Sequence, residues 1–261
     1  MEQETPDFNL NKLNISKKTA INSLVTASLS FIPSVGPYLA EGFNYYGKVK
    51  QERLNLFLER LNEYFNGLSN EEIEPEFLKS EDFARLFEAV LKKVSDTKSE
   101  NKRETFRKIL INSIGAKKVS DFSETFLYLT SQLHEKQIEI LTVYRETNNK
   151  VSELESRINN LNQEHKLNQD AWSKTPADYL MRKMSELDHE IYSKRMEAKL
   201  LVEKLNPESF GITKTEFLFY QQDLVSKCLL KDISGFGIGS DNSIDFTVTL
   251  FGEKYLEFIL L

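Results

Sequence analysis

The sequence predicts a mainly α-helical protein with an antiparallel coiled-coil hairpin past its middle and a small α+β unit at its C-terminus. Three observations support this fold class. Apolar residues recur three or four positions apart over most of the 261 residues, which is the helical period. Two stretches keep that spacing regularly enough to form heptad seams. Near the end, two short β-capable runs flank a glycine-rich segment.

The composition is that of a folded protein in a reducing compartment. Hydrophobic residues make up 40% of the chain and charged residues 28%, while glycine and proline are scarce, as helices require. The one cysteine, Cys228, excludes an intrachain disulfide and lies on an apolar helical face, where a buried, inert thiol is expected. The chain does not start with the pattern of a secretion signal. We therefore expect a cytoplasmic protein.

The N-terminal part, residues 1–118, is predicted to be a helical domain. Apolar residues line one side of a helix over 45–65, and further helices are expected to begin at Ser80 and at Ser99, because serine is a favoured N-cap. Residues 122–144 continue the helical pattern as the next helix.

Segment 19–40 is the longest run without a charged side chain. Pro33 and Gly36 divide it, so its uninterrupted part is shorter than the roughly 20 residues that a bilayer span needs. A buried helix and turn, a membrane-inserting hairpin and a groove for a partner remain the three interpretations of this segment.

Two arms with heptad spacing fill residues 150–205. The apolar positions of the first arm are Val151, Leu154, Ile158 and Leu161, and those of the second are Leu180, Met184, Leu187, Ile191, Ala198, Leu201 and Leu205, with Lys194 as a polar exception. The arms are joined by a turn-like break around Trp172 and Pro176. They bury their seams most simply against each other, as an antiparallel hairpin with arms of about 30 to 40 Å at 1.5 Å per residue. An intermolecular coiled coil is the alternative.

The last quarter of the chain predicts a helix followed by a β-hairpin and a closing helix. The helix covers 213–230, the strands 229–233 and 243–248, and the closing helix 252–261. Between the strands stands GFGIGSDN, whose glycines permit the positive φ of a hairpin turn.

This order, closed by Thr249, Gly252, Tyr255, Leu256 and Phe258, resembles the L-T-x-x-G-x-x-F-L ending of bacterial winged-helix domains. The resemblance implies a winged-helix-like unit made of 119–149 and 206–261, with the coiled-coil hairpin of 150–205 inserted into it. The layout as a whole, with KRETFRKILINSI in its N-terminal half, is also similar to the abortive-infection alpha type of bacterial proteins. That similarity implies phage defence by association.

Charge argues against DNA binding by the C-terminal unit. Residues 206–261 hold four basic and eight acidic side chains, and an acidic wing would repel phosphate. The basic stretch is 92–118, with nine basic and three acidic residues, and its candidate anion or nucleic-acid ligands are Lys102, Arg103, Arg107, Lys108, Lys117 and Lys118. Arg103 and Arg107 are four residues apart and share a helix face. A solvated face is the alternative.

The sequence holds no recognisable catalytic, metal or cofactor motif. Glu186 and His189 form a lone E-x-x-H without the second copy that a di-iron bundle needs, and the heptad register places both outside the seam. Arg182 and His189 have a spacing found in helical ribonucleases but lie outside the seam as well. The three glycines of 235–239 precede a strand, whereas a phosphate loop precedes a helix. We therefore predict no enzyme, cofactor, metal or small-molecule substrate.

The leading functional prediction is an interaction or regulatory protein that binds a protein partner or a second copy of itself. Trp172, at the predicted hairpin tip, is the candidate contact residue, because an exposed indole offers apolar area and one hydrogen-bond donor. The alternatives are a winged-helix transcription regulator and a membrane-acting effector that uses 19–40.

Overall fold

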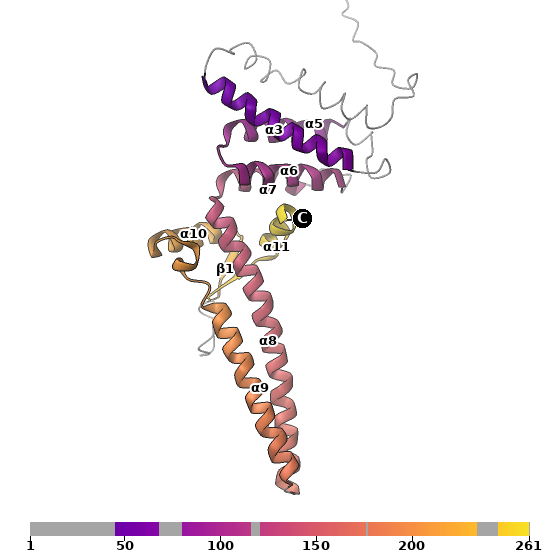
Figure 1. Ribbon diagram of the computed structural model, residues 1–261, viewed down its shortest axis with the longest axis vertical. Helices are drawn as coiled ribbons and strands as arrows, with labels where there is room; N and C mark the ends of the chain where they lie inside the picture. The colour runs from indigo at the N-terminus through magenta and orange to yellow at the C-terminus, as the bar shows by residue number, and fades with distance from the viewer. Residues whose placement is uncertain (1–44, 68–79, 116–120, 176, 234–244, 261) are drawn as a thin grey trace, which may run out of the picture. The chain divides into compact units, whose positions relative to one another are not determined.

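The computed structural model describes residues 45–67, 80–115, 121–175, 177–233 and 245–260 (Figure 1). These residues form eight α-helices, one short 3-10 helix and a single two-stranded antiparallel sheet. The prediction of a mainly helical protein with a small C-terminal sheet is therefore confirmed. The chain divides into two compact units, one of Met1–Gln132 with Phe258–Leu261 and one of Leu133–Glu257.

The first unit contains α3 (Tyr45–Gly67), α5 (Glu81–Asp96), α6 (Glu100–Gly115) and α7 (Asp121–Gln132). Helix α3 packs on α5 and α6, and α6 packs on α7. The core of this unit is apolar and includes Leu61, Leu86, Val90, Phe106, Ile109, Leu110 and Phe126. The last residues of helix α11 (Leu250–Leu260) complete it, because the Phe258 ring lies 5.3 Å from that of Phe126.

Both predicted serine caps are present. Ser80 Oγ accepts a hydrogen bond from the Phe83 backbone N–H at 3.2 Å, and Ser99 Oγ accepts one from the Lys102 N–H at 3.0 Å. Each hydroxyl satisfies one of the N–H groups that a helix leaves unpaired at its start.

The prediction of one helix over 122–144 is wrong. Helix α7 ends at Gln132, and α8 (Glu135–Lys174) begins after a short break. His134 caps the new helix: its Nδ1 accepts from the Lys136 N–H at 3.2 Å, while Gln137 Oε1 accepts from the His134 N–H at 2.7 Å. These reciprocal bonds stabilise a second helix start where the apolar spacing alone reads as continuous.

Helices α8 and α9 (Asp178–Val202) pack along each other in opposite directions (Figure 1). The early α8 residues Val151 and Leu154 form a buried cluster with the late α9 residue Ala198. The later α8 residue Leu161 forms another with the earlier α9 residues Leu187 and Ile191. The part of α8 from residue 150 to its end at Lys174 and the 25 residues of α9 are each about 37 Å long at 1.5 Å per residue, which agrees with the predicted arm length.

One face of α8 is buried for most of its length. The buried positions follow heptad spacing and include Gln137, Ile140, Tyr144, Thr147, Val151, Leu154 and Leu161. The first part of this face packs against α10 and β2, and the second part against α9. Residue 150, a predicted boundary between two domains, lies inside this continuous helix, and the three-domain division stays a prediction.

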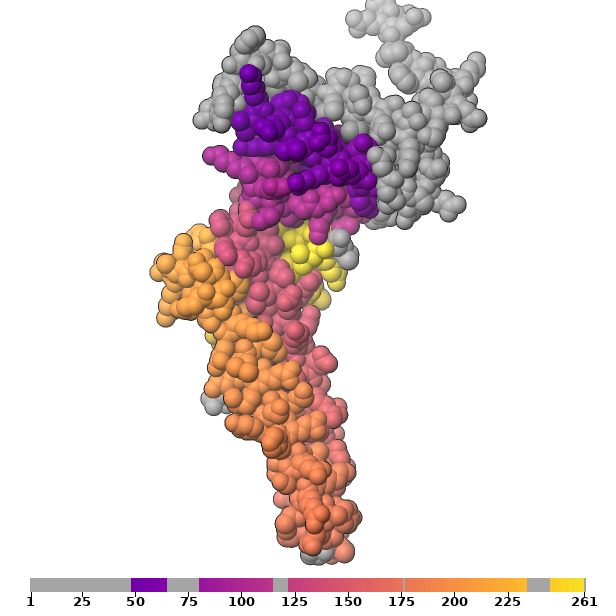
Figure 2. Space-filling view, viewed as in Figure 1, coloured from indigo at the N-terminus to yellow at the C-terminus, as the bar shows by residue number. Residues whose placement is uncertain are grey.

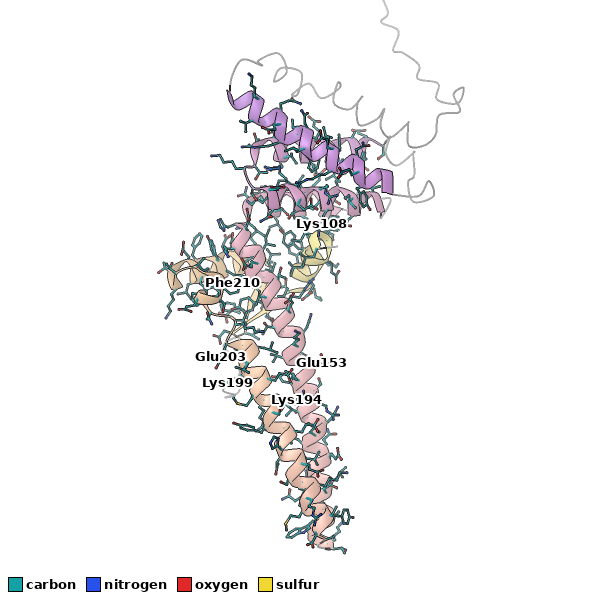
Figure 3. The ribbon with its side chains drawn as sticks, viewed as in Figure 1. Lys108, Glu153, Lys194, Lys199, Glu203 and Phe210 are labelled. Carbon is teal, nitrogen blue, oxygen red and sulfur yellow. The ribbon has the colours of Figure 1, made fainter. Side chains whose placement is uncertain are left out.

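The C-terminal part of the second unit consists of short elements: η2 (Pro207–Phe210), α10 (Lys214–Ser226), β1 (Leu230–Asp232), β2 (Phe246–Val248) and most of α11. The strands pair antiparallel with Leu230 opposite Val248. Figure 3 labels Phe210, whose ring stacks on that of Phe217 with 5.6 Å between centroids. The predicted glycine-rich turn lies outside the described residues.

Thr249 and Gly252 hold the start of α11 against β1. Thr249 Oγ1 accepts a hydrogen bond from the Gly252 N–H at 2.9 Å and donates one to the Cys228 carbonyl oxygen at 2.6 Å. A Cβ added at Gly252 would lie 2.4 Å from the Leu229 carbonyl oxygen. The helix can approach the strand this closely only because residue 252 has no side chain.

The prediction of a buried Cys228 is wrong. Helix α10 ends at Ser226, and Cys228 follows it in the left-handed conformation with a φ of 58°. The chain has turned away from the helical face that buries Leu224, so the thiol is exposed.

Segment 19–40 lies outside the described residues. Among the helices that are described, none combines the length and the apolar character needed to cross a membrane.

Candidate interaction surfaces

The predicted basic surface lies on α6. The described members are Lys102, Arg103, Arg107 and Lys108, whereas Lys117 and Lys118 fall outside the described residues. All four described side chains are partly buried, and each donates hydrogen bonds within the first unit.

The side chains of Lys102 and Arg103 donate hydrogen bonds to backbone carbonyl groups at the C-terminal ends of α7 and α5. Lys102 Nζ donates to the Ser131 carbonyl oxygen at 3.2 Å. Arg103 Nη1 donates to the carbonyl oxygens of Thr97 and Lys98 at 3.4 and 3.2 Å. Carbonyl groups at helix ends lack intrahelical donors, so both cations have a structural role here.

Arg107 and Lys108 also have partners inside the unit. Arg107 Nε donates to Glu104 Oε2 at 2.9 Å, and a second bond joins the guanidinium to the other carboxylate oxygen. Lys108, labelled in Figure 3, donates to the Leu260 carbonyl oxygen at 3.1 Å. An anionic ligand would have to displace these partners, and anion binding by α6 stays a prediction.

The guanidiniums of Arg60, Arg103 and Arg107 surround a hollow of about 50 Å³ together with Glu100 and Glu104. A hydrogen bond from Arg60 lowers the pKa of Glu100, and one from Arg107 lowers the pKa of Glu104. A water molecule needs about 10–15 Å³ of such space, so the hollow has room for a few water molecules.

Trp172 lies near the C-terminal end of α8 and is half-buried. Other large apolar side chains of the same end of the helix pair are more exposed: Leu167 by 70%, Tyr179 by 69% and Met181 by 55%. The end of the pair therefore presents apolar surface, in which Trp172 is the more shielded member.

A second set of apolar side chains, the α9 row, consists of Tyr192, Met196 and Leu200. They are 64%, 39% and 57% exposed. Their four-residue spacing places them in one line along the helix. At about 100° per residue, the row points away from the face on which Leu187 and Ile191 contact α8. In Figure 2 one side of α9, in orange, is exposed along the length of the helix pair.

The α9 row was not predicted from the sequence, although its signal is present there. In the heptad register of α9, Tyr192, Met196 and Leu200 occupy outer positions, which are normally polar in a helix whose inner face is already paired. Exposed apolar residues gathered on one face mark an interaction surface more often than scattered ones do.

Polar contacts align α8 with α9 on both sides of the seam. They are the ion pairs Lys183–Glu164 at 2.8 Å and Arg157–Glu190 at 3.0 Å, and the contact of His165 Nε2 with Asp188 Oδ1 at 3.3 Å. The hydrogen bond from Lys183 lowers the pKa of Glu164. Exposed pairs add little stability, but opposite charges at these positions favour one register of the two helices.

No family model, curated protein or solved structure matches this chain. Glu186 and His189 are both exposed on α9. Among the described residues, no three His, Cys, Asp or Glu side chains are grouped to hold a metal ion.

A buried polar pair joins α8 to α10. Tyr144 is 3% exposed and Gln221 is 5% exposed, and Gln221 Nε2 donates a hydrogen bond to Tyr144 Oη at 2.6 Å. Burial raises the pKa of Tyr144 to about 12, because the phenolate would lose its hydration. The hydroxyl is therefore protonated, and able to donate, at neutral pH.

This shift predicts a loss of stability at high pH. Below pH 10 the phenol is protonated in both the folded and the unfolded chain, and Tyr144 adds no pH dependence. From pH 10 towards 12 the unfolded chain loses this proton first, so the free energy of unfolding should fall by roughly 2 kcal/mol. Urea unfolding of the wild type and of Tyr144→Phe checks this. The difference in the free energy of unfolding between the two proteins should be constant below pH 10. Above pH 10 the wild type should lose stability relative to Tyr144→Phe, and a difference that stays constant up to pH 12 would contradict the prediction.

Proposed function

We propose that the chain is a non-enzymatic interaction or regulatory protein that acts through protein contacts of α8 and α9, paired as an antiparallel coiled coil. The clusters of Val151 with Ala198 and of Leu161 with Ile191 support the coiled coil. Lys194, labelled in Figure 3, supports it too: it is a polar residue in the seam, and its ammonium reaches outward to Glu197 Oε2 at 3.0 Å.

The α9 row carries this proposal. Fully burying a fully exposed apolar side chain of this size contributes about 1.5–3 kcal/mol. The three side chains of the row are 39% to 64% exposed, so each has roughly half of that to gain, and three in a line give a partner helix a continuous contact. An aromatic residue and a methionine, two of the three, are enriched in protein interfaces. The row is independent of the residues that hold α9 on α8, so a partner can bind it without opening the pair.

A second copy of this chain is the partner that the charges favour. Continued by four residues in each direction, the α9 row ends at Asp188 and at Lys204, which lies in the turn after the helix. Two rows crossing in opposite directions would bring Asp188 of each copy towards Lys204 of the other. Asp188 is 68% exposed and keeps its His165 contact, because a carboxylate accepts several hydrogen bonds.

Sedimentation equilibrium of the full chain tests the proposal. The wild type should exceed its monomer mass of 30.3 kDa as its concentration rises to about 100 µM, in the range of a weak helix–helix contact. The triple variant Tyr192→Ser, Met196→Ser, Leu200→Ser should remain monomeric. These side chains are exposed, so its helical circular dichroism should be unchanged.

The matched control replaces Tyr179 and Met181, which are equally exposed but lie at the end of the pair, by serine. This control should associate like the wild type. A wild type that stays at the monomer mass, or a triple variant that associates equally well, would rule out the α9 row as a self-association surface.

Phage defence is the cellular role we propose from the resemblance to the abortive-infection alpha type. The winged-helix-like unit would then contact protein, since four basic against eight acidic residues in 206–261 oppose DNA binding. The triple serine variant is also the comparison for a phage infection assay. Cells with the wild-type chain should yield fewer phage plaques than cells with the variant, and equal yields for every phage tested would remove this role.

A further inference from the structure

A cleft of about 440 Å³ opens in the second unit, where η2, α10 and the start of β2 meet α8. Its walls are somewhat more apolar than polar, and the apolar side chains include Leu205, Phe217, Leu218 and Phe246. Sites for small molecules are typically clefts of roughly 300–1,000 Å³ with apolar walls and a few polar groups. The cleft has this size and this lining.

Two buried polar side chains, Tyr144 and Gln221, also line the cleft. Tyr144 Oη accepts from Gln221 Nε2 at 2.6 Å, which leaves the hydroxyl hydrogen to be donated to another acceptor. The Tyr144 ring is fixed edge-on to Phe246, with centroids 6.1 Å apart at 76°. A ligand oxygen in the cleft can accept this hydrogen in place of water.

The charged residues that line the cleft select against anions. Glu208 and Asp245 contribute two carboxylates, whereas Lys214 contributes one ammonium group, and all three are exposed. The resulting charge of the rim is negative, so it repels a carboxylate or phosphate and accepts a neutral molecule.

We propose that this cleft binds a neutral, amphipathic small molecule with an aromatic or branched apolar body and a carbonyl oxygen that accepts the Tyr144 hydroxyl hydrogen. The body lies between Phe217, Leu218 and Phe246, where it is removed from water. The oxygen reaches the Tyr144–Gln221 pair. The site shares no residue with the α9 row, so it stands or falls independently of the self-association proposed above. A ligand in this cleft would make the chain a ligand-binding protein, whereas the sequence predicts no small-molecule substrate.

Saturation-transfer NMR with the full chain tests this site with two probes of the same shape, neutral 2-naphthamide and anionic 2-naphthoate. The wild type should transfer saturation to the amide at least five times more strongly than to the carboxylate. Tyr144→Phe keeps the ring and removes the donor, and it should reduce transfer to the amide at least fivefold.

Leu218→Trp provides a second test that leaves the buried pair intact. Leu218 is 50% exposed, so the larger ring can fill the mouth of the cleft without entering the core, and transfer to the amide should be lost. The triple serine variant of the α9 row should bind like the wild type. Equal transfer to both probes, no transfer to the wild type, or full transfer to both Tyr144→Phe and Leu218→Trp would overturn the proposal.

Discussion

Replacing Gly252 by alanine is expected to lower the free energy of unfolding by about 3 kcal/mol. The new Cβ would stand 2.4 Å from the Leu229 carbonyl oxygen and 2.8 Å from Val248 Cγ1. The Leu229 backbone cannot easily retreat, because its N–H donates to the Leu224 carbonyl at 2.9 Å and its own carbonyl accepts from the Thr249 N–H at 3.1 Å. Either α11 moves away from β1 or both hydrogen bonds are strained. Guanidinium unfolding followed by circular dichroism measures the loss.

Gly211→Ala is the matched control for this change. Gly211 has a φ of +64°, and a Cβ there meets no atom within 4 Å. Its substitution should cost only about 1 kcal/mol, because the left-handed conformation disfavours a side chain. If Gly252→Ala costs no more than Gly211→Ala, then the close approach of α11 to β1 does not exist in solution.

Replacing Leu161 by alanine is expected to cost about 2–3 kcal/mol. Leu161 is 2% exposed and packs with Leu187 and Ile191 across the helix pair. Removing its side chain leaves a cavity between two helices that have few other apolar contacts at this level. The loss should appear as a lower guanidinium midpoint.

Leu167→Ala is the same substitution six positions further along α8, at a side chain that is 70% exposed. It should change stability by less than about 0.5 kcal/mol. Equal losses for the two variants would show that α8 and α9 do not pack through Leu161, and the coiled-coil proposal would fail with it.

Local patterns predicted much of the fold. Ser80 and Ser99 mark helix starts because a hydroxyl satisfies N–H groups within its own first turn. The two strands were predicted because β-capable runs flank glycines. The same local view failed over 122–144, where His134 and Gln137 start a new helix within an unbroken apolar pattern.

The candidate surfaces could be predicted only in part. The heptad register already places Tyr192, Met196 and Leu200 outside the seam, so the α9 row was within reach of the sequence. The partners of the basic residues could not be predicted, because Lys108 donates to the carbonyl oxygen of Leu260, which is 152 positions away. The Tyr144–Gln221 pair could not be predicted either, because it joins residues 77 positions apart.

The sequence by itself determined the helical class, the helix starts and the faces that heptad spacing buries, because these depend on residues within a few turns of one another. Only the tertiary structure decided which cations are engaged, that Cys228 is exposed, and that Tyr144 and Gln221 share a cleft with Phe246. The engaged cations and the cleft depend on contacts between distant segments. The exposure of Cys228 depends on where α10 ends and how the chain turns there, which the apolar spacing does not encode.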